Sequence, residues 1–125
     1  MIVSQQTRIQ VMDVLDRLIV AASRNDTDTV MALLAPDFTA FAREMTEPVL
    51  DRNRLRERLE QGYADLPGSL SDPRIMAEGT IAWVTAECAP ASRDHRSARS
   101  GKFSAVLRGT GHTWEFVHIH VSNPE

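Results

Sequence analysis

The chain has 125 residues, of which 42% are hydrophobic and 25% charged, and its formal net charge is −3 at pH 7. These values are typical of one globular domain over residues 1–125, and they exclude the strongly basic surface that nucleic-acid binding requires. The single cysteine, Cys88, excludes an internal disulfide and favours a cytoplasmic location. The first ten residues hold no signal-peptide core, and no run of about 18 apolar residues exists, so no membrane-spanning helix is expected.

Two helices are expected at the start of the chain. Apolar residues recur three and four positions apart over residues 11–22, which predicts an amphipathic helix over about residues 4–24. Asp26 or Thr27 is expected to cap a second, short helix, because both side chains can accept a hydrogen bond from the first helical turn. Pro36 is expected to end that helix, since the residue before a proline avoids the helical conformation.

A third helix and a series of strands follow. Asp51 or Asn53 is expected to start the helix, and Pro67 and Gly68 to end it. Apolar periodicity then changes to a period of two. Strands are predicted over residues 38–42, 74–77, 80–88, 102–108 and 113–122. The polar residues 89–101 are interpreted as a long hairpin connection.

The last predicted strand carries the candidate functional residues. Strict alternation divides its side chains between the two faces of the sheet. One face holds Trp114, Phe116, His118 and His120, and the other holds Glu115, Val117, Ile119 and Val121. Two histidines beside two aromatic side chains are typical of a pocket wall, so this face is expected to point inward.

The pairing of the last two strands favours the same orientation. A two-residue turn at Thr110 and Gly111 sets Leu107 opposite Trp114. It also makes Arg108 a diagonal neighbour of Glu115, close enough for an ion pair. Because charges are costly in an apolar interior, the face with this ion pair is expected to be the outer one.

The order of the predicted elements and several short segments resemble the SnoaL-like branch of the nuclear-transport-factor-2-like and ketosteroid-isomerase-like proteins. The segments are residues 25–28, 31–38, 82–84, 103–108 and 114–122. The resemblance implies an α+β fold, the cystatin-like cone, in which a bent antiparallel sheet wraps around the long N-terminal helix. It also implies a cavity open at one end and a homodimer formed through the outer face of the sheet. Val117, Ile119 and Val121 are expected to lie in that interface.

The catalytic residues of ketosteroid isomerases do not carry over to this sequence. Those enzymes use a tyrosine on the first helix and an aspartate on the first strand. The matching positions fall near Leu18 and near Phe41 or Ala42. None of these side chains can move a proton, so the isomerase mechanism is not expected, and whether the protein is an enzyme stays open.

Two functions remain open from the sequence. The first is binding of a small hydrophobic or aromatic molecule in the cone, with His118 and His120 as catalytic acid–base residues. The expected ligand contacts are Trp114, Phe116, Phe103, Phe41 and Tyr63. The alternative is a non-catalytic dimerisation or assembly module whose cavity is filled by its own side chains. Neither function requires a cofactor.

A metal site is a more specific interpretation of the two histidines. A His-x-His pair on a strand presents two imidazoles to one ion, and zinc would need a further ligand. Glu87 and His112 are possible donors, but the spacing selects neither of them, so no metal is expected. Cys88 is expected to be a small buried apolar residue.

Overall fold

The computed structural model describes residues 3–41, 49–62, 66–89 and 101–122. In this part of the chain the helices are α1 (Gln5–Ser23), α2 (Thr27–Ala32) and α3 (Arg52–Glu60). The strands are β1 (Leu34–Ala40), β2 (Leu50–Asp51), β3 (Ser69–Glu78), β4 (Ile81–Ala89), β5 (Gly101–Gly109) and β6 (Trp114–Ser122). Among the described helices, none combines the length and hydropathy needed to cross a bilayer.

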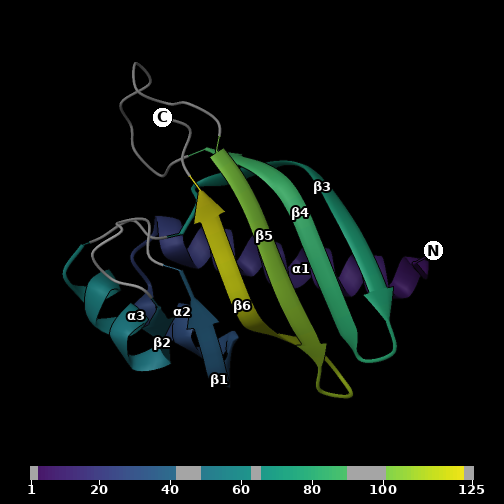
Figure 1. The fold of residues 1–125 in the computed structure, drawn as a ribbon, viewed down its shortest axis with the longest axis horizontal. Coiled ribbons are helices and arrows are strands. Elements are labelled where there is room, and N and C mark those ends of the chain that lie inside the picture. Colours follow the sequence, from purple (N-terminus) through teal and green to yellow (C-terminus); the bar gives the residue numbers. More distant parts are fainter. Residues whose placement is uncertain (1–2, 42–48, 63–65, 90–100, 123–125) are drawn as a thin grey trace.

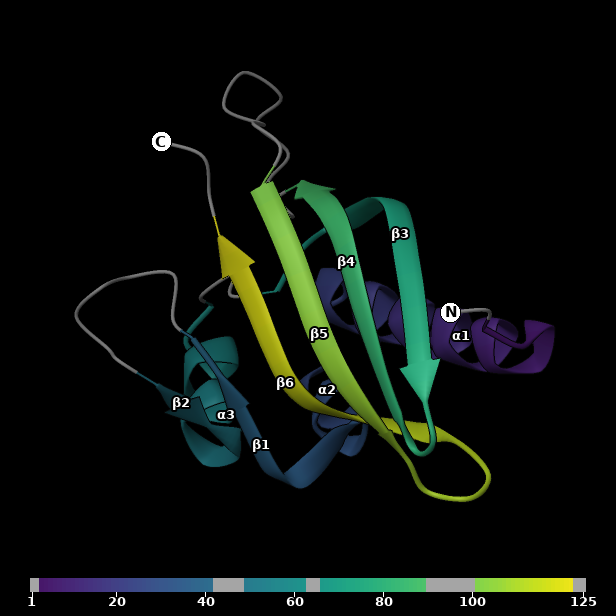
Figure 2. The same ribbon diagram turned by 45° about the vertical axis from the view of Figure 1, so that its right-hand side comes forward.

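The strands form one bent sheet in the order β2-β1-β6-β5-β4-β3. β1 runs parallel to β6, and the other neighbouring strands are antiparallel. Figures 1 and 2 show α1 lying across the concave side of this sheet, with α2 and α3 beside β1 and β2. The predicted α+β cystatin-like cone is confirmed.

Each helix begins at a side chain that accepts a hydrogen bond from a backbone N–H three residues later. The pairs are Ser4 with Thr7 at 3.1 Å, Asp26 with Thr29 at 3.2 Å and Asp51 with Arg54 at 2.7 Å. Of the two alternatives left open for each later helix, the caps are therefore Asp26 and Asp51. These bonds satisfy N–H groups that a helix cannot pair internally.

The junction between α2 and β1 differs from the prediction. α2 ends at Ala32, and Leu34 begins a strand instead of extending the helix. Pro36 lies within this strand, where the ladder with β6 is interrupted between Leu34 and Thr39. Proline has no N–H to donate, so it is tolerated where a ladder is broken. The strand predicted over residues 38–42 therefore starts earlier than expected.

The end of α3 also differs from the prediction. The helix ends at Glu60, ahead of the expected stop at Pro67. Gly62 follows with a φ of +90°, a left-handed conformation that glycine adopts without steric cost. Tyr63, like most of residues 89–101, lies outside the described residues.

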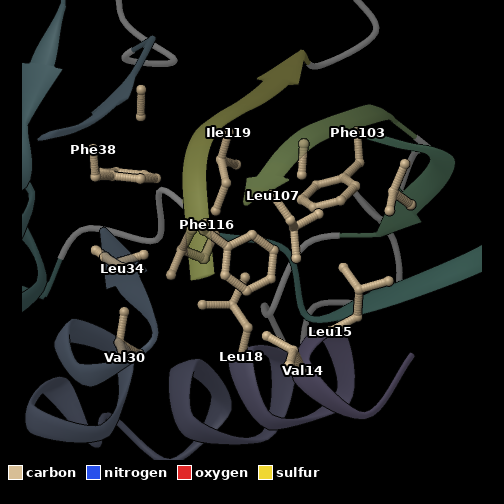
Figure 3. Close-up of a cluster of buried hydrophobic side chains, with 14 of the residues drawn as sticks. Val14, Leu15, Leu18, Val30, Leu34, Phe38, Phe103, Leu107, Phe116 and Ile119 are labelled. Atoms are coloured by element: carbon tan, nitrogen blue, oxygen red, sulfur yellow. The ribbon is translucent and has the colours of Figure 1, made fainter. Parts of the chain in front are cut away.

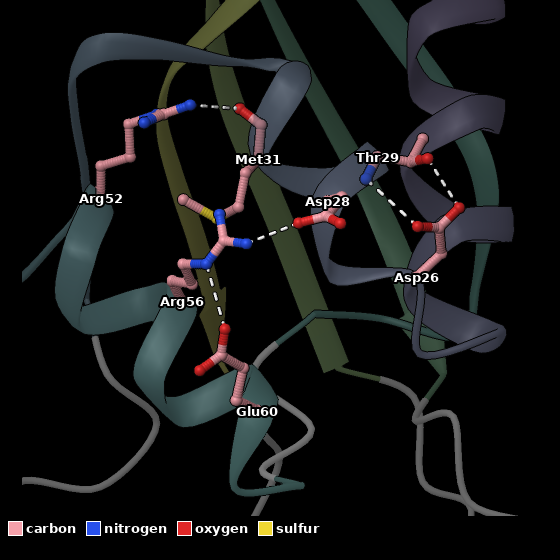
Figure 4. Close-up of polar contacts among 7 residues, drawn as sticks. All are labelled: Asp26, Asp28, Thr29, Met31, Arg52, Arg56 and Glu60. Carbon is pink, nitrogen blue, oxygen red and sulfur yellow. Dashed lines mark hydrogen bonds and ion pairs between the residues drawn. The ribbon is translucent and has the colours of Figure 1, made fainter.

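The arginines of α3 bind groups of the same domain. Arg56 forms ion pairs with Asp28 of α2 and with Glu60 of α3, and Arg52 donates a hydrogen bond of 2.9 Å to the carbonyl of Met31 (Figure 4). These contacts join α3 to α2. They agree with the low net charge in arguing against a basic binding surface.

The core lies between α1 and the concave face of the sheet. Figure 3 shows Val14, Leu15 and Leu18 of α1 pointing toward Leu107 of β5 and Phe116 of β6. Phe116 is completely buried, and burying an aromatic or aliphatic side chain of this size contributes about 1.5–3 kcal/mol to stability. This packing decides which face of each strand is the inner one.

A bulge in β6 changes the face on which its later side chains lie. Leu107 pairs with Phe116, but the preceding Val106 pairs with His118. Val117 is therefore an extra residue in β6 that has no partner of its own in the β5 ladder. One extra residue shifts the period-two alternation by one position, so inward and outward positions exchange.

The orientation predicted for the second half of β6 is therefore wrong. Ile119 and Val121 point inward and are only 1% and 6% exposed, whereas the sequence pattern placed them outside. His118 is half-buried and His120 is exposed, and both lie on the outer face. The inward position of Phe116, ahead of the bulge, is confirmed.

The loop that joins β5 to β6 is longer than predicted. Gly109 pairs with Trp114, so residues 110–113 form a four-residue loop in place of a two-residue turn. Arg108 consequently lies directly opposite Glu115 instead of diagonal to it. The predicted ion pair between them is confirmed, at 3.0 Å on the outer face.

Candidate functional site: the outer face of the sheet

The residues predicted to share one pocket are divided between the two faces of the sheet. Trp114, Phe116 and Phe103 are buried on the inner side. His118, His120 and Phe41 lie together on the outer side. The structure therefore does not assemble the expected pocket, because the bulge at Val117 separates the histidines from the two aromatic residues that precede them.

The outer group forms a compact arrangement, here termed the histidine cluster (Thr39, Phe41, His118 and His120). Thr39 Oγ1 lies 3.0 Å from Nδ1 of His118, and the tautomer of the imidazole decides which of them donates the hydrogen bond. The Phe41 ring meets both imidazoles edge to face, at centroid distances of 5.3 Å to His118 and 5.4 Å to His120. Such edge contacts are favourable for rings with opposite charge at face and edge.

The surroundings of His118 favour its neutral form. Burial lowers the pKa of its imidazole below the ordinary value of 6.5, a hydrogen bond with the Thr39 backbone raises it, and the neighbouring His120 lowers it. The net effect on the pKa is downward. A half-buried imidazole is therefore held neutral near pH 7, where protonation would place a charge among apolar neighbours.

Apolar side chains from three further strands adjoin the cluster and form an apolar band (Met76, Ile81, Trp83 and Val106). Trp83 of β4 pairs with Met76 on one side and with Val106 on the other, and Val106 in turn pairs with His118. Ile81 is 37% exposed and Phe41 of the cluster is 48% exposed. Exposed apolar side chains that are grouped in this way mark interaction surfaces more often than isolated ones do.

At one end of this surface, three charged residues form two ion pairs that share Arg108. Arg108 binds Asp37 of β1 at 2.8 Å and Glu115 of β6 at 3.0 Å. The hydrogen bond from Arg108 is the main cause that lowers the pKa of Asp37, and both acids raise the pKa of Arg108. At the other end, Lys102 binds Glu87 at 3.1 Å.

Glu87 and His112, considered as possible metal donors, are not gathered around the two histidines. Glu87 binds Lys102, and His112 lies in the loop between β5 and β6. Within the described ranges, no group of three or more histidine, cysteine, aspartate or glutamate residues is arranged to hold an ion. Cys88 is buried, as expected from the sequence.

Apolar side chains fill the part of the cone interior that the structure describes. Leu18, near which the resemblance puts the isomerase tyrosine, is buried in the core, and Phe41, near which it puts the aspartate base, lies outside on the sheet. Of the described residues that are buried, only Arg58 of α3 carries a charge. The described interior therefore offers packing in place of acid–base groups.

Small hollows lie at the margins of the fold. One of about 170 Å³ lies between the end of α1, the start of α2 and the end of α3, with Ala22, Val30 and Leu59 in its wall. Trp114 borders two others, of about 450 and 190 Å³, near the ends of the last hairpin. Its indole N–H donates a hydrogen bond of 3.0 Å to Gln10 of α1. None of these hollows contains the histidine cluster.

Sequence reasoning missed Thr39 and left the face of Trp83 open. Thr39 carries no local signal, because its contact with His118 depends on the long-range pairing of β1 with β6. The face of Trp83 was not determined by its own strand, where apolar residues occupy both sides. The partner strand contains the missing information, since Trp83 lies beside Val106 in the ladder.

Comparisons with known proteins agree with the geometry. The SnoaL-like domain family matches residues 11–125, and no curated protein matches the chain. An NTF2-like protein of unknown function from Pseudomonas putida KT2440 superposes with a TM-score of 0.84 and 17% identity, over 97% of this chain and 89% of that one. A protein of unknown function with a cystatin-like fold from Nostoc punctiforme PCC 73102 gives 0.80 and 14%, over 100% and 97%.

The association domain of CaMKII from C. elegans is a further structural neighbour. Its TM-score is 0.78 and its identity 19%, over 95% of this chain and 97% of that one. Identities this low show a shared fold and leave function open. The family match, in contrast, covers most of the sequence. The chain therefore belongs to the SnoaL-like domain family.

Proposed function

We propose that this domain is a non-catalytic association module, two copies of which pair through the outer face of the sheet. One observation carries the proposal. The interior of the cone is filled by its own side chains, whereas Phe41 and Ile81 stay exposed on a sheet face that none of the described helices covers. An apolar sheet face gains free energy when a second surface removes it from water.

The size of the outer face suits a dimer. Strands β1, β6, β5, β4 and β3 are neighbours, and at ~4.8 Å between strands and ~3.3 Å per residue they present a face of roughly 20 by 25 Å. Two such faces bury about 1,000 Å² in projection, and more once protruding side chains are included. Stable interfaces begin at about 1,200 Å² in total.

The charges on this face favour a second copy over a strongly charged partner. Arg108 is balanced by Asp37 and Glu115, and Lys102 is balanced by Glu87. On β3, the same face carries one charge of each sign, Arg74 and Glu78. Surfaces whose charges are already paired do not repel an identical surface. A nucleic acid, in contrast, requires an excess of positive charge.

The interface residues differ from those that the sequence predicted. Ile119 and Val121 point into the core, so they cannot contact a partner. The apolar band takes their place on the outer face. The name of the CaMKII association domain gives independent support that this fold is used for assembly in another protein.

Ligand binding inside the cone has less support. A small aromatic molecule would need the space that Phe116, Leu107 and Leu15 occupy. Acid–base chemistry by His118 and His120 stays a prediction, and both side chains lie on the outer face of the sheet. An association surface accounts for the same two residues without requiring a substrate.

Sedimentation equilibrium of the purified protein at pH 7.5 tests the proposal. We expect a dimer, and Val106→Lys should convert it to a monomer because the substitution places a charge in the centre of the apolar band. The matched control is Val20→Lys, on the exposed side of α1, which should remain dimeric. A monomeric wild-type protein, or a dimer that survives Val106→Lys, would contradict the proposal.

A further inference from the structure

Resting on the proposed function, we propose that the histidine cluster makes this association pH-dependent, so that protonation of His118 separates the two copies. The inference adds regulation to the outer face. It is argued from the position of His118, from its fixed orientation and from the charges around it.

His118 lies at the centre of the surface that a second copy would cover. In the ladder it pairs with Val106 on one side and with Thr39 on the other, and Val106 pairs in turn with Trp83. His118 therefore stands in one row with Thr39, Val106 and Trp83. A partner that covers Trp83 and Phe41 must also cover the imidazole between them.

The imidazole is held in place before any partner binds. Thr39 bonds to Nδ1 of His118, and the ring of Phe41 meets the imidazole at an interplanar angle of 84°. Both contacts lie within one protomer, so His118 cannot easily turn away from an approaching surface. Protonation would therefore create a charge inside the interface and not at its rim.

Few neighbouring groups are available to neutralise that charge. β5 presents Ser104 and Val106 beside the two histidines, with Lys102 and Arg108 further along the strand. β1 contributes the hydroxyl of Thr39, and Phe41, just beyond the end of β1, contributes its ring. Among the described residues, the carboxylates nearest on the surrounding strands are those of Asp37, Asp51, Glu87 and Glu115. Arg108 binds Asp37 and Glu115, Lys102 binds Glu87, and Asp51, which pairs with Thr39, accepts the backbone N–H of Arg54 at the start of α3. Glu78 lies on β3, at the far edge of the sheet.

The protomer already opposes protonation of His118, since burial and the nearby His120 lower its pKa. Association would remove more water and lower that pKa further. The dimer therefore binds fewer protons than two separate copies do, and acid drives dissociation. With one proton per copy, the dissociation constant should rise by up to roughly a hundredfold per pH unit below the pKa of the monomer.

The net charge of the protein would change the strength of association in the opposite direction to protonation of His118. The sequence pI is about 5.8, so lowering the pH from 7.5 toward 5.8 reduces the net charge and the mutual repulsion of the copies. General electrostatics thus predicts tighter association on acidification, and the histidine cluster predicts weaker association. The sign of the change separates the two causes.

The experiment is sedimentation equilibrium at pH 7.5 and pH 5.5, with circular dichroism to verify that the protein remains folded. We expect the dissociation constant of the wild-type dimer to be higher at pH 5.5 than at pH 7.5. His118→Asn should remain dimeric at both values, because asparagine cannot titrate but can still bond to Thr39. The matched control, His112→Asn in the hairpin loop, should behave as the wild type.

The outcomes also separate this inference from the proposed function. A wild type that is dimeric at pH 7.5 and equally dimeric at pH 5.5 overturns the inference and leaves the proposed function standing. A wild type that is monomeric at pH 7.5 contradicts the proposed function and the inference together. Should His118→Asn not fold, an NMR titration of the wild type at low and high concentration gives the answer. The pKa of His118 should be lower in the concentrated sample, and equal values would overturn the inference.

Discussion

Thr39 Oγ1 and His118 Nδ1 lie 3.0 Å apart, in a hydrogen bond that joins residues separated by 79 positions in the chain. The two residues are also direct partners in the ladder between β1 and β6, which run parallel. The bond thus lies where the N-terminal strand joins the C-terminal hairpins. It secures the sheet at this point and sets the orientation of the imidazole on the outer face.

Removing the hydroxyl of Thr39 should lower the free energy of unfolding by the contribution of one hydrogen bond. Thr39→Val keeps the branched shape of the side chain, so we expect a loss of about 1 kcal/mol in the free energy of unfolding. Urea denaturation at one fixed protein concentration measures it. Thr85→Val, on the exposed outer side of β4, is the control and should change stability little. Equal losses in both variants would mean that the bond to His118 is not what stabilises the sheet.

The bulge in β6 gives opposite expectations for two adjacent residues. Ile119→Ala removes a buried side chain and should cost about 2–5 kcal/mol, whereas His120→Ala removes an exposed one and its edge contact with Phe41 and should cost about 1 kcal/mol or less. Urea denaturation of both variants checks the difference. If His120→Ala were the more destabilising variant, His120 would be the inward residue, and the uninterrupted alternation that the sequence predicts would be correct.

The features that depend on short-range chemistry were predictable from the sequence. Asp26 and Asp51 form their capping bonds three residues away, so the signal and its effect lie in one short window. The inner face of β5, with Phe103 and Leu107, follows from regular alternation within a single strand. These local rules gave the order of the helices and strands, and the resemblance to the SnoaL-like proteins then implied the fold.

The candidate site was not predictable in the same way, because one inserted residue changed its geometry. The second half of β6 alternates in the opposite phase to the first half, with polar residues at His118 and His120 and apolar ones at Ile119 and Val121. Interpreting each half separately gives the observed faces, and Val117 is the extra residue between them. A uniform period across all nine residues concealed this signal.

The ion pair of Arg108 can be followed through the pKa of Asp37. The hydrogen bond from Arg108 lowers the pKa of Asp37 below its ordinary value of 3.8. Arg108→Gln should therefore raise that pKa toward 3.8, which an NMR titration of the carboxyl carbons can measure. Asp26 is the control, since its lowered pKa is caused mainly by Thr29 and should not move.

The same pair makes stability depend on pH in a defined direction. A carboxylate whose pKa is lowered by folding stabilises the protein fully above its unfolded pKa, and this contribution disappears as the pH falls through the lower, folded pKa. In the wild type, the contribution of Asp37 is thus complete above about pH 3.8 and is lost below it. Arg108→Gln should lose less stability over that acidic range than the wild type. An identical decline in both proteins would argue against the pair.

A filled interior makes a further prediction about small ligands. Wild-type protein should show no thermal shift with benzene or indole, because Phe116 and its neighbours leave no room for them. Phe116→Ala should cost about 3–5 kcal/mol and open an apolar cavity, so the same compounds should now stabilise the variant.

Phe116→Leu, with a smaller loss of volume, serves if the alanine variant does not fold. His120→Ala, on the outer face, is the control and should gain no affinity. Stabilisation of the wild type that Phe116→Ala abolishes would instead support ligand binding inside the cone, and the association module would lose its main structural argument.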